Sequence, residues 1–125
     1  MRNISRRNSG QALVEFALVI TILFFILMGV FDLGRGIYAY NVTASAAREG
    51  ARYGILDPTN NSAIQTQTLA NTPALDQSQI TVTIQCTPSC STSNSISVTV
   101  TYRFVPVTLF FAAFNVTGKS TMTIE

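Results

Sequence analysis

Residues 16–31 of the chain read FALVITILFFILMGVF, a run of sixteen positions without a charged residue. Thr21 is the polar interruption in this run, and Asp32 ends it. Extending the run back to Gln11 gives 21 residues, among which Glu15 carries the charge. A helix rises about 1.5 Å per residue, so roughly 20 residues cross the hydrocarbon core of a bilayer. The sequence therefore predicts a membrane-spanning helix over residues 11–31, with Glu15 close to one end.

The charges that flank this run predict its orientation. Arg2, Arg6 and Arg7 precede it, whereas Arg35 is the basic residue that follows it closely. Because basic residues gather on the cytoplasmic side of a membrane helix, we expect the N-terminus in the cytoplasm and the C-terminal part outside. A secretory signal peptide has a shorter apolar region, of about 7–15 residues, and a small-residue cleavage site after it. Those features do not match this chain, whereas an uncleaved signal anchor fits the hydropathy as well as a processed leader does.

The composition argues against several function classes. Charged residues make up 11% of the chain, far below the roughly 25% of a soluble domain. Three of the eight basic residues lie before residue 10, so the remainder holds five basic residues against six acidic ones. A basic face for nucleic acid is therefore not expected. The sequence has no histidine, which is the most common general base and metal ligand. We expect neither an enzyme nor a protein that needs a cofactor or metal.

Glu15 is the residue that hydropathy alone does not explain. A carboxylate within an apolar helix costs several kcal/mol near the bilayer centre and less near an end. One interpretation is that the side chain snorkels from one turn inside the membrane to the headgroups. In the other, Glu15 pairs with a cation of another protein. Cleavage after Gly10 would supply such a cation, because Gln11 would then carry a new amine, although desolvation offsets part of the gain.

The sequence around Glu15 resembles a known family. Residues 6–19 read RRNSGQALVEFALV, which looks like the cleavage region of a type IV prepilin and resembles the TadE-like pseudopilins of the tight-adherence (Tad/Flp) pilus system. The resemblance implies that a prepilin peptidase cuts after Gly10 and that Glu15, fifth in the mature chain, acts in assembly. Ordinary type IV and type II secretion pilins usually begin the mature chain with phenylalanine or methionine. Gln11 departs from that pattern and favours the tight-adherence branch.

The helix is expected to continue beyond the membrane run to about Tyr53, with Gly54 as its C-cap. Asp32 and Arg35 can pair at spacing i, i+3. Residues 46–53 read AAREGARY and also resemble the segment that closes the long helix of TadE-like proteins. The small residues of this region either seat the helix against its own domain or form part of a face for a neighbouring subunit. Residues that recur at helical spacing are Ile37, Tyr40, Ala44, Ala47 and Ala51.

The remainder predicts a short helix and a small antiparallel sheet. The helix is expected over residues 63–70, with Asn60 or Asn61 as its cap. Apolar and polar residues alternate over residues 80–86 and 96–104, and Met122 and Ile124 suggest a third strand. The sheet should pack on the outer half of the long helix, which makes the fold α+β.

Two details of this part bear on its location. Cys86 and Cys90 lie at the predicted hairpin tip, where a disulfide is favoured outside the cytoplasm. Residues 105–114 read VPVTLFFAAF, and this apolar stretch either belongs to the core, dips into the membrane surface or meets another subunit.

These observations together predict a leader over residues 1–10, a transmembrane and extended helix over 11–54, and a small exported α/β domain over 55–125. The resemblance implies a minor pseudopilin-like assembly protein of a tight-adherence pilus, held in the cytoplasmic (inner) membrane. Its expected partners are prepilin peptidase, other pilin-like subunits, inner-membrane assembly proteins and the lipid bilayer. The alternatives are a pseudopilin of a type II secretion or related system, and an uncleaved signal-anchored surface binding protein.

Overall fold

The computed structural model of the chain describes residues 5–108 and 111–125, with side chains described from Gly10 onward. Part of the predicted leader, including Arg2, lies outside the described residues, as do Leu109 and Phe110 of the apolar stretch. The described elements are the helices α1 (Ser5–Leu56) and α2 (Asn61–Ala70), the short 3-10 helix η1 (Gln77–Gln79) and the strands β1 (Ile80–Thr87), β2 (Ser95–Phe104) and β3 (Phe114–Thr123). The predicted α+β fold class is confirmed.

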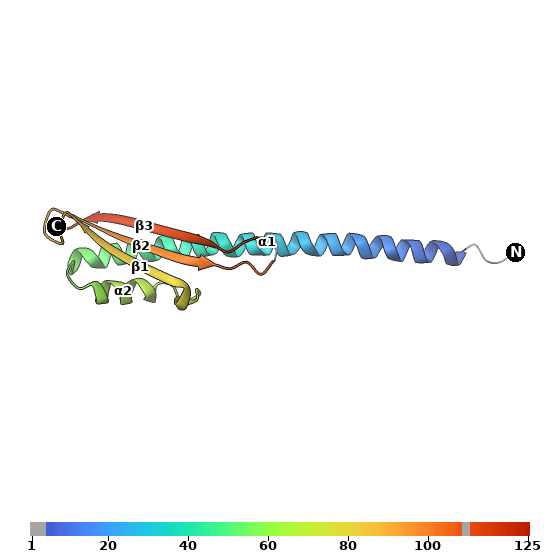
Figure 1. Cartoon of the computed structure of the whole chain (residues 1–125), viewed down its shortest axis with the longest axis horizontal. Coiled ribbons are helices and arrows are strands. Elements are labelled where there is room, and N and C mark those ends of the chain that lie inside the picture. Colours follow the sequence, from blue (N-terminus) through green and yellow to red (C-terminus); the bar gives the residue numbers. More distant parts are fainter. Residues whose placement is uncertain (1–4, 109–110) are drawn as a thin grey trace.

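Helix α1 spans 52 residues, which corresponds to about 78 Å. Figure 1 shows that the sheet and α2 cover its C-terminal half, whereas its N-terminal half projects alone. The predicted C-cap at Gly54 is wrong, because α1 continues to Leu56. A Cβ atom at Gly54 would lie 2.5 Å from the Cδ1 atom of Ile96. Gly54 thus leaves room for the Ile96 side chain of the sheet and does not mark the helix end.

The strands form an antiparallel sheet in the order β1-β2-β3, with β2 in the centre. Val98 of β2 pairs with Ile84 of β1 and Ser120 of β3, and Val100 pairs with Val82 and Gly118. Opposed residues share a face of the sheet, so these pairs bring the apolar rows of β1 and β2 together against α1. The alternation that predicted these two strands therefore also predicted the face that packs on the helix.

The core lies between this face, α1 and α2. Small residues on α1 let the sheet approach, and each fully buried Ile or Val side chain of the core contributes about 1.5–3 kcal/mol of transfer free energy. Helix α2 closes one side, and its N-cap is Asn60, whose side chain accepts a hydrogen bond from the Ala63 N–H at 3.2 Å. The fully buried members of this main cluster are Ala46, Ala47, Ala51, Ile64, Ile96, Val98 and Val100.

Strand β3 is much longer than the terminal strand predicted around Met122 and Ile124. It includes Met122 but ends at Thr123, and Ile124 follows it as a buried residue. It begins at Phe114 and includes the polar sequence of residues 117–121, which carries no apolar alternation. Gly118 stands at a position that faces α1 and has no room for a side chain. A Cβ atom there would lie 2.5 Å from the carbonyl group of Thr43. The strand therefore packs by backbone proximity to the helix, a feature that hydrophobic periodicity does not reveal.

Candidate functional site on the N-terminal half of the long helix

The N-terminal half of α1 is an apolar surface that the rest of the chain leaves uncovered. Every residue from Gly10 to Leu27 is exposed, and apolar side chains of this segment such as Leu13 and Phe24 keep more than half of their surface accessible. Apolar patches of this size on a protein surface mark contact with lipid or with another protein. Among the described residues, α1 is the helix that is long and apolar enough to cross a membrane.

The predicted cleavage junction lies in exposed helical backbone. Gly10 and Gln11 both belong to α1, and among the described side chains beyond its chain neighbours none lies within 4 Å of the position that a Cβ at Gly10 would occupy. Glycine weakens a helix by about 0.5–1 kcal/mol relative to alanine. The junction is therefore sterically open, and Gly10 is a point at which the helix unwinds at low cost.

Glu15 follows Gln11 by four residues, so both lie on one face of α1, about one turn apart. Its side chain is exposed among apolar neighbours, and no ion pair to it occurs among the side chains described from Gly10 onward. A carboxylate in this position is available to a partner that approaches the helix from the side. An amine created on Gln11 would lie within one turn of Glu15 of the same chain, and within reach of a neighbouring chain packed in parallel.

The predicted small-residue positions lie in the other half of α1. Ala47 and Ala51 are fully buried against the chain's own core, and Ala44 is half-buried. A Cβ atom at Gly118 of β3 would come within 2.6 Å of the Ala44 amide nitrogen. These positions thus bring α1 and its own sheet together.

A disulfide joins Cys86 to Cys90, with their Cα atoms 5.1 Å apart. It lies at the end of the β1–β2 hairpin, where Cys86 pairs with Ile96 across from the last turns of α1. This end of the molecule is remote from the bare half of the helix (Figure 1). A helix that crossed a membrane through its bare half would therefore hold the disulfide well away from the bilayer.

Asp32 makes more contacts than the pair with Arg35 that its spacing predicted. Its carboxylate is 3% exposed and accepts three hydrogen bonds from the start of the β2–β3 connection. The donors are the Val107 N–H at 3.1 Å, the Thr108 N–H at 2.8 Å and the Thr108 hydroxyl at 2.7 Å. The Arg35 guanidinium adds an ion pair at 3.4 Å. Asp32, which ends the apolar run of α1, thus fastens the start of the β2–β3 connection to the helix.

The base of the same connection packs around two aromatic rings. The rings of Phe104 and Phe114 lie 5.2 Å apart, and the Arg35 guanidinium carbon lies 5.4 Å from the centre of the Phe104 ring. Phe104 itself is buried with Ala39 and Val116 in a second core cluster. The signal that could have found this site is Asp32 itself, since a carboxylate at the end of an apolar run needs donors close by.

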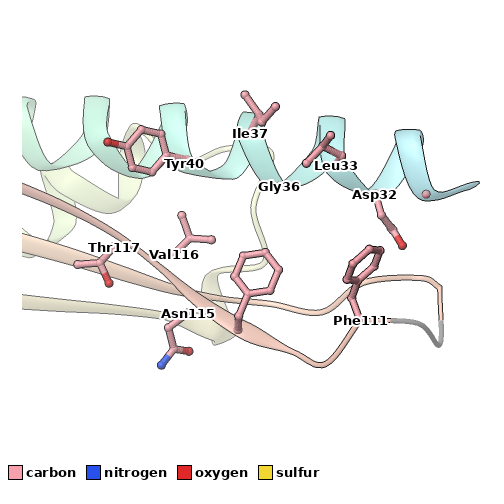
Figure 2. A pocket seen from close by; sticks show the side chains of 11 residues that line it. Asp32, Leu33, Gly36, Ile37, Tyr40, Phe111, Asn115, Val116 and Thr117 are labelled. Carbon is pink, nitrogen blue, oxygen red and sulfur yellow. The ribbon is translucent and has the colours of Figure 1, made fainter.

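A cleft of about 680 Å³ lies between this part of α1 and the strand β3 with the connection before it. Figure 2 shows Leu33, Ile37 and Tyr40 along the helix side, with Phe111 close to Asp32. The lining is mainly apolar. Among the described residues, no group of three histidine, cysteine, aspartate or glutamate side chains converges to hold a metal ion.

Comparison with known proteins places the N-terminal segment in a family. The model of the family described as TadE-like protein matches residues 10–52. This segment begins at the predicted cleavage glycine, includes Glu15 and Asp32, and ends within the alanine-rich part of α1. No curated protein matches the chain, and no solved structure matches it. Residues 10–52 are therefore a TadE-like segment, and the family resemblance predicted from the sequence is confirmed.

Proposed function

We propose that the chain is a minor pseudopilin-like assembly protein of a tight-adherence pilus, matured by a prepilin peptidase. The carrying observation is the exposed apolar half of α1, in which Glu15 stands five residues after Gly10 within the TadE-like segment. A surface of this kind has to be covered, first by lipid and then by neighbouring helices. The function is one of assembly, without a catalytic step.

In this proposal, α1 holds the subunit in the cytoplasmic membrane until it joins or assists the pilus machinery. The N-terminus faces the cytoplasm, because the arginines precede the apolar run. The sheet and the disulfide then lie outside, where oxidation is favoured. The partners are the prepilin peptidase, other pilin-like subunits and the inner-membrane assembly proteins, with the bilayer as the resting environment.

Glu15 is assigned to recognition between subunits. Its carboxylate would pair with the amine that cleavage creates on Gln11 of an adjacent subunit, in surroundings of low dielectric. Removing one member of a desolvated charge pair costs about 3–5 kcal/mol. If only about 1.4 kcal/mol of this cost appears in the binding free energy between subunits, their association weakens tenfold.

The mature N-terminus tests the maturation step. Co-expression with an active prepilin peptidase should give a product that begins at Gln11, and co-expression with an inactivated peptidase should leave the leader in place. Gly10→Val should also block the cut, because it adds a branched side chain at the scissile position. An intact leader with the active peptidase, or a cut elsewhere, would support the uncleaved signal anchor instead.

Capture of partner subunits tests the role of Glu15. Glu15→Gln should insert into the membrane normally and should recover much less of the other pilus subunits in a pull-down from detergent extracts. Glu49→Gln is the matched control, because Glu49 lies in the half of α1 that packs on the sheet. Equal recovery with both variants and the unaltered chain would remove Glu15 from the assembly step.

A further inference from the structure

The sequence from Phe104 to Gly118 leads from the end of β2 into β3, at the end of the sheet nearest the bare helix. It has no charged residue. The core was one of the expectations for the apolar stretch over residues 105–114. Its large described side chains lie outside the core, although the flanking Phe104 and Val116 are buried. Val105, Val107 and Phe111 keep 55%, 59% and 60% of their surface exposed, and Phe114 keeps 48%. Four large apolar side chains of this stretch are therefore left uncovered by the rest of the described chain, at the end of the sheet nearest the bare helix.

The described ends of this connection are held in place. Asp32 binds the backbone N–H groups of Val107 and Thr108, and the Phe104 and Phe114 rings pack together at the base. The anchoring carboxylate belongs to the residue that directly follows the apolar run of α1. The positions of Val107 and Phe114 relative to that run are therefore determined by the fold.

Their level along the helix matches the last turn of the apolar run. Phe111 lines the same cleft as Gly29 and Leu33, so this part of the connection reaches back past Asp32. Figure 1 shows that the β2–β3 connection extends farther toward the N-terminal end of α1 than the strands do, and Figure 2 shows Phe111 beside Asp32. Leu33 and Ile37 contribute exposed apolar surface on the helix side of the cleft.

Aromatic residues with a polar tip lie at the next level of the helix. Tyr38 and Tyr40 are exposed on α1, six and eight residues beyond Asp32, or about two turns. Tyrosine and tryptophan gather at the boundary between hydrocarbon and headgroups. The order along the axis is thus an apolar run, then the exposed side chains at the Asp32 level, and then tyrosines.

We propose that the junction face, formed by Leu33, Ile37, Phe111 and Phe114 with Val107 beside it, is a second membrane contact that inserts into the phospholipid interface of the outer leaflet. This inference rests on the proposed crossing of the membrane by α1. Phospholipid is the occupant because the junction face continues the lipid-facing surface of α1, lies at the level where that surface ends, and carries no charge along the connection.

A second point of contact restricts the subunit in a way that a lone helix does not. A single helix is free to rotate about its axis and to tilt in the bilayer, whereas a side contact at the interface sets both angles. The junction face lies on the side of α1 that the sheet occupies. The opposite side of the helix then remains available to other subunits.

Tryptophan fluorescence tests the proposal directly, because the chain has no tryptophan of its own. The full chain carrying Phe111→Trp is placed in phosphatidylcholine–phosphatidylglycerol nanodiscs at one chain per disc. Brominated phospholipids with bromine near the headgroup end or near the chain end then serve as quenchers. Phe24→Trp reports on the membrane-spanning segment, and Leu56→Trp is a matched exposed control, since Leu56 is 80% exposed at the far end of α1.

The expected result is blue-shifted emission from Phe111→Trp and a loss of intensity that is larger with bromine near the headgroup. Phe24→Trp should be quenched more by bromine near the chain end, and Leu56→Trp by neither lipid. Quenching at Phe24→Trp with water-exposed, unquenched Phe111→Trp would overturn the second contact and leave the helix crossing intact. No quenching at Phe24→Trp would overturn the crossing and the second contact with it. Shielding of Phe111→Trp that appears only with two chains per disc would identify a second copy as the occupant and refute the lipid contact.

Discussion

The substitution Asp32→Ala should release the β2–β3 connection from α1 while leaving the sheet folded. The carboxylate accepts the Val107 and Thr108 N–H groups on different oxygens, and the Thr108 hydroxyl shares one of them. Alanine offers no acceptor. The two amides should then exchange their hydrogens through local opening and not through unfolding of the whole domain.

The magnitude follows from the charge of the acceptor. A hydrogen bond to a charged group contributes about 1.5–3 kcal/mol net, and each 1.4 kcal/mol is about a tenfold change in an opening equilibrium. Amide exchange should therefore accelerate by about 10- to 150-fold. Thr108 is 8% exposed, so its amide has little access to replacement water and should fall toward the upper end. Val107 is exposed and should fall toward the lower end.

Hydrogen exchange followed at single residues by nuclear magnetic resonance in detergent micelles measures the effect. Arg35→Ala is the control, because it removes the 3.4 Å ion pair and the contact of the guanidinium with the Phe104 ring but keeps all three acceptor contacts of Asp32. The Arg35 side of this pair is 41% exposed, so solvent screens the interaction and the variant should change the exchange of Thr108 little. Central amides of β2 report on global stability. Unchanged exchange in Asp32→Ala, or an equal effect of Arg35→Ala, would refute the assignment of Asp32 as the fastening group.

Two further predictions concern packing and the hairpin. Gly118→Ala should destabilise the fold by about 1–3 kcal/mol, because the new methyl group meets the Thr43 carbonyl. Gly34→Ala, where no atom lies within 4 Å, should be neutral or stabilising by up to about 1 kcal/mol; equal melting temperatures of the two variants would contradict the close contact. Replacing Cys86 and Cys90 together by serine should cost about 2 kcal/mol, the low end for a disulfide because the loop is short. Identical denaturant midpoints for the oxidised and reduced unaltered chain would show that the disulfide adds no stability.

Much of this architecture follows from periodicity and charge that can be read along the chain. The alternation over residues 80–86 and 96–104 places every second side chain on one face, so two strands and their buried face were predictable. The apolar run over residues 16–31 predicted the bare helix, since it is uncharged and, extended back to Gln11, long enough to cross a bilayer. Both patterns are local, because each can be recognised from one short segment of the sequence without knowledge of its distant partners.

The missed features depend on contacts between distant residues. Gly54 looks like a helix end in the sequence, but its lack of a side chain leaves space for the Ile96 side chain of β2. Gly118 interrupts the expected alternation of β3 because the backbone at Thr43 occupies the space of a side chain. Asp32 looks like the polar end of an apolar run, whereas its donors lie 75 and 76 residues later. In each case the residue is explained by its partner, and no spacing rule connects the two.

The change in character along α1 also explains why Asp32 lies where it does. On its N-terminal side, large apolar residues surround the helix, and a helix is suited to lipid because it satisfies its own backbone groups. On its C-terminal side, Ala47 and Ala51 permit a sheet to approach one face closely. Because the sheet packs on one half of α1 only, the β2–β3 connection at the boundary between the halves would otherwise be free to move relative to the helix. The Asp32 carboxylate removes that freedom with three hydrogen bonds, so the sheet and the bare half of α1 are held in one fixed orientation.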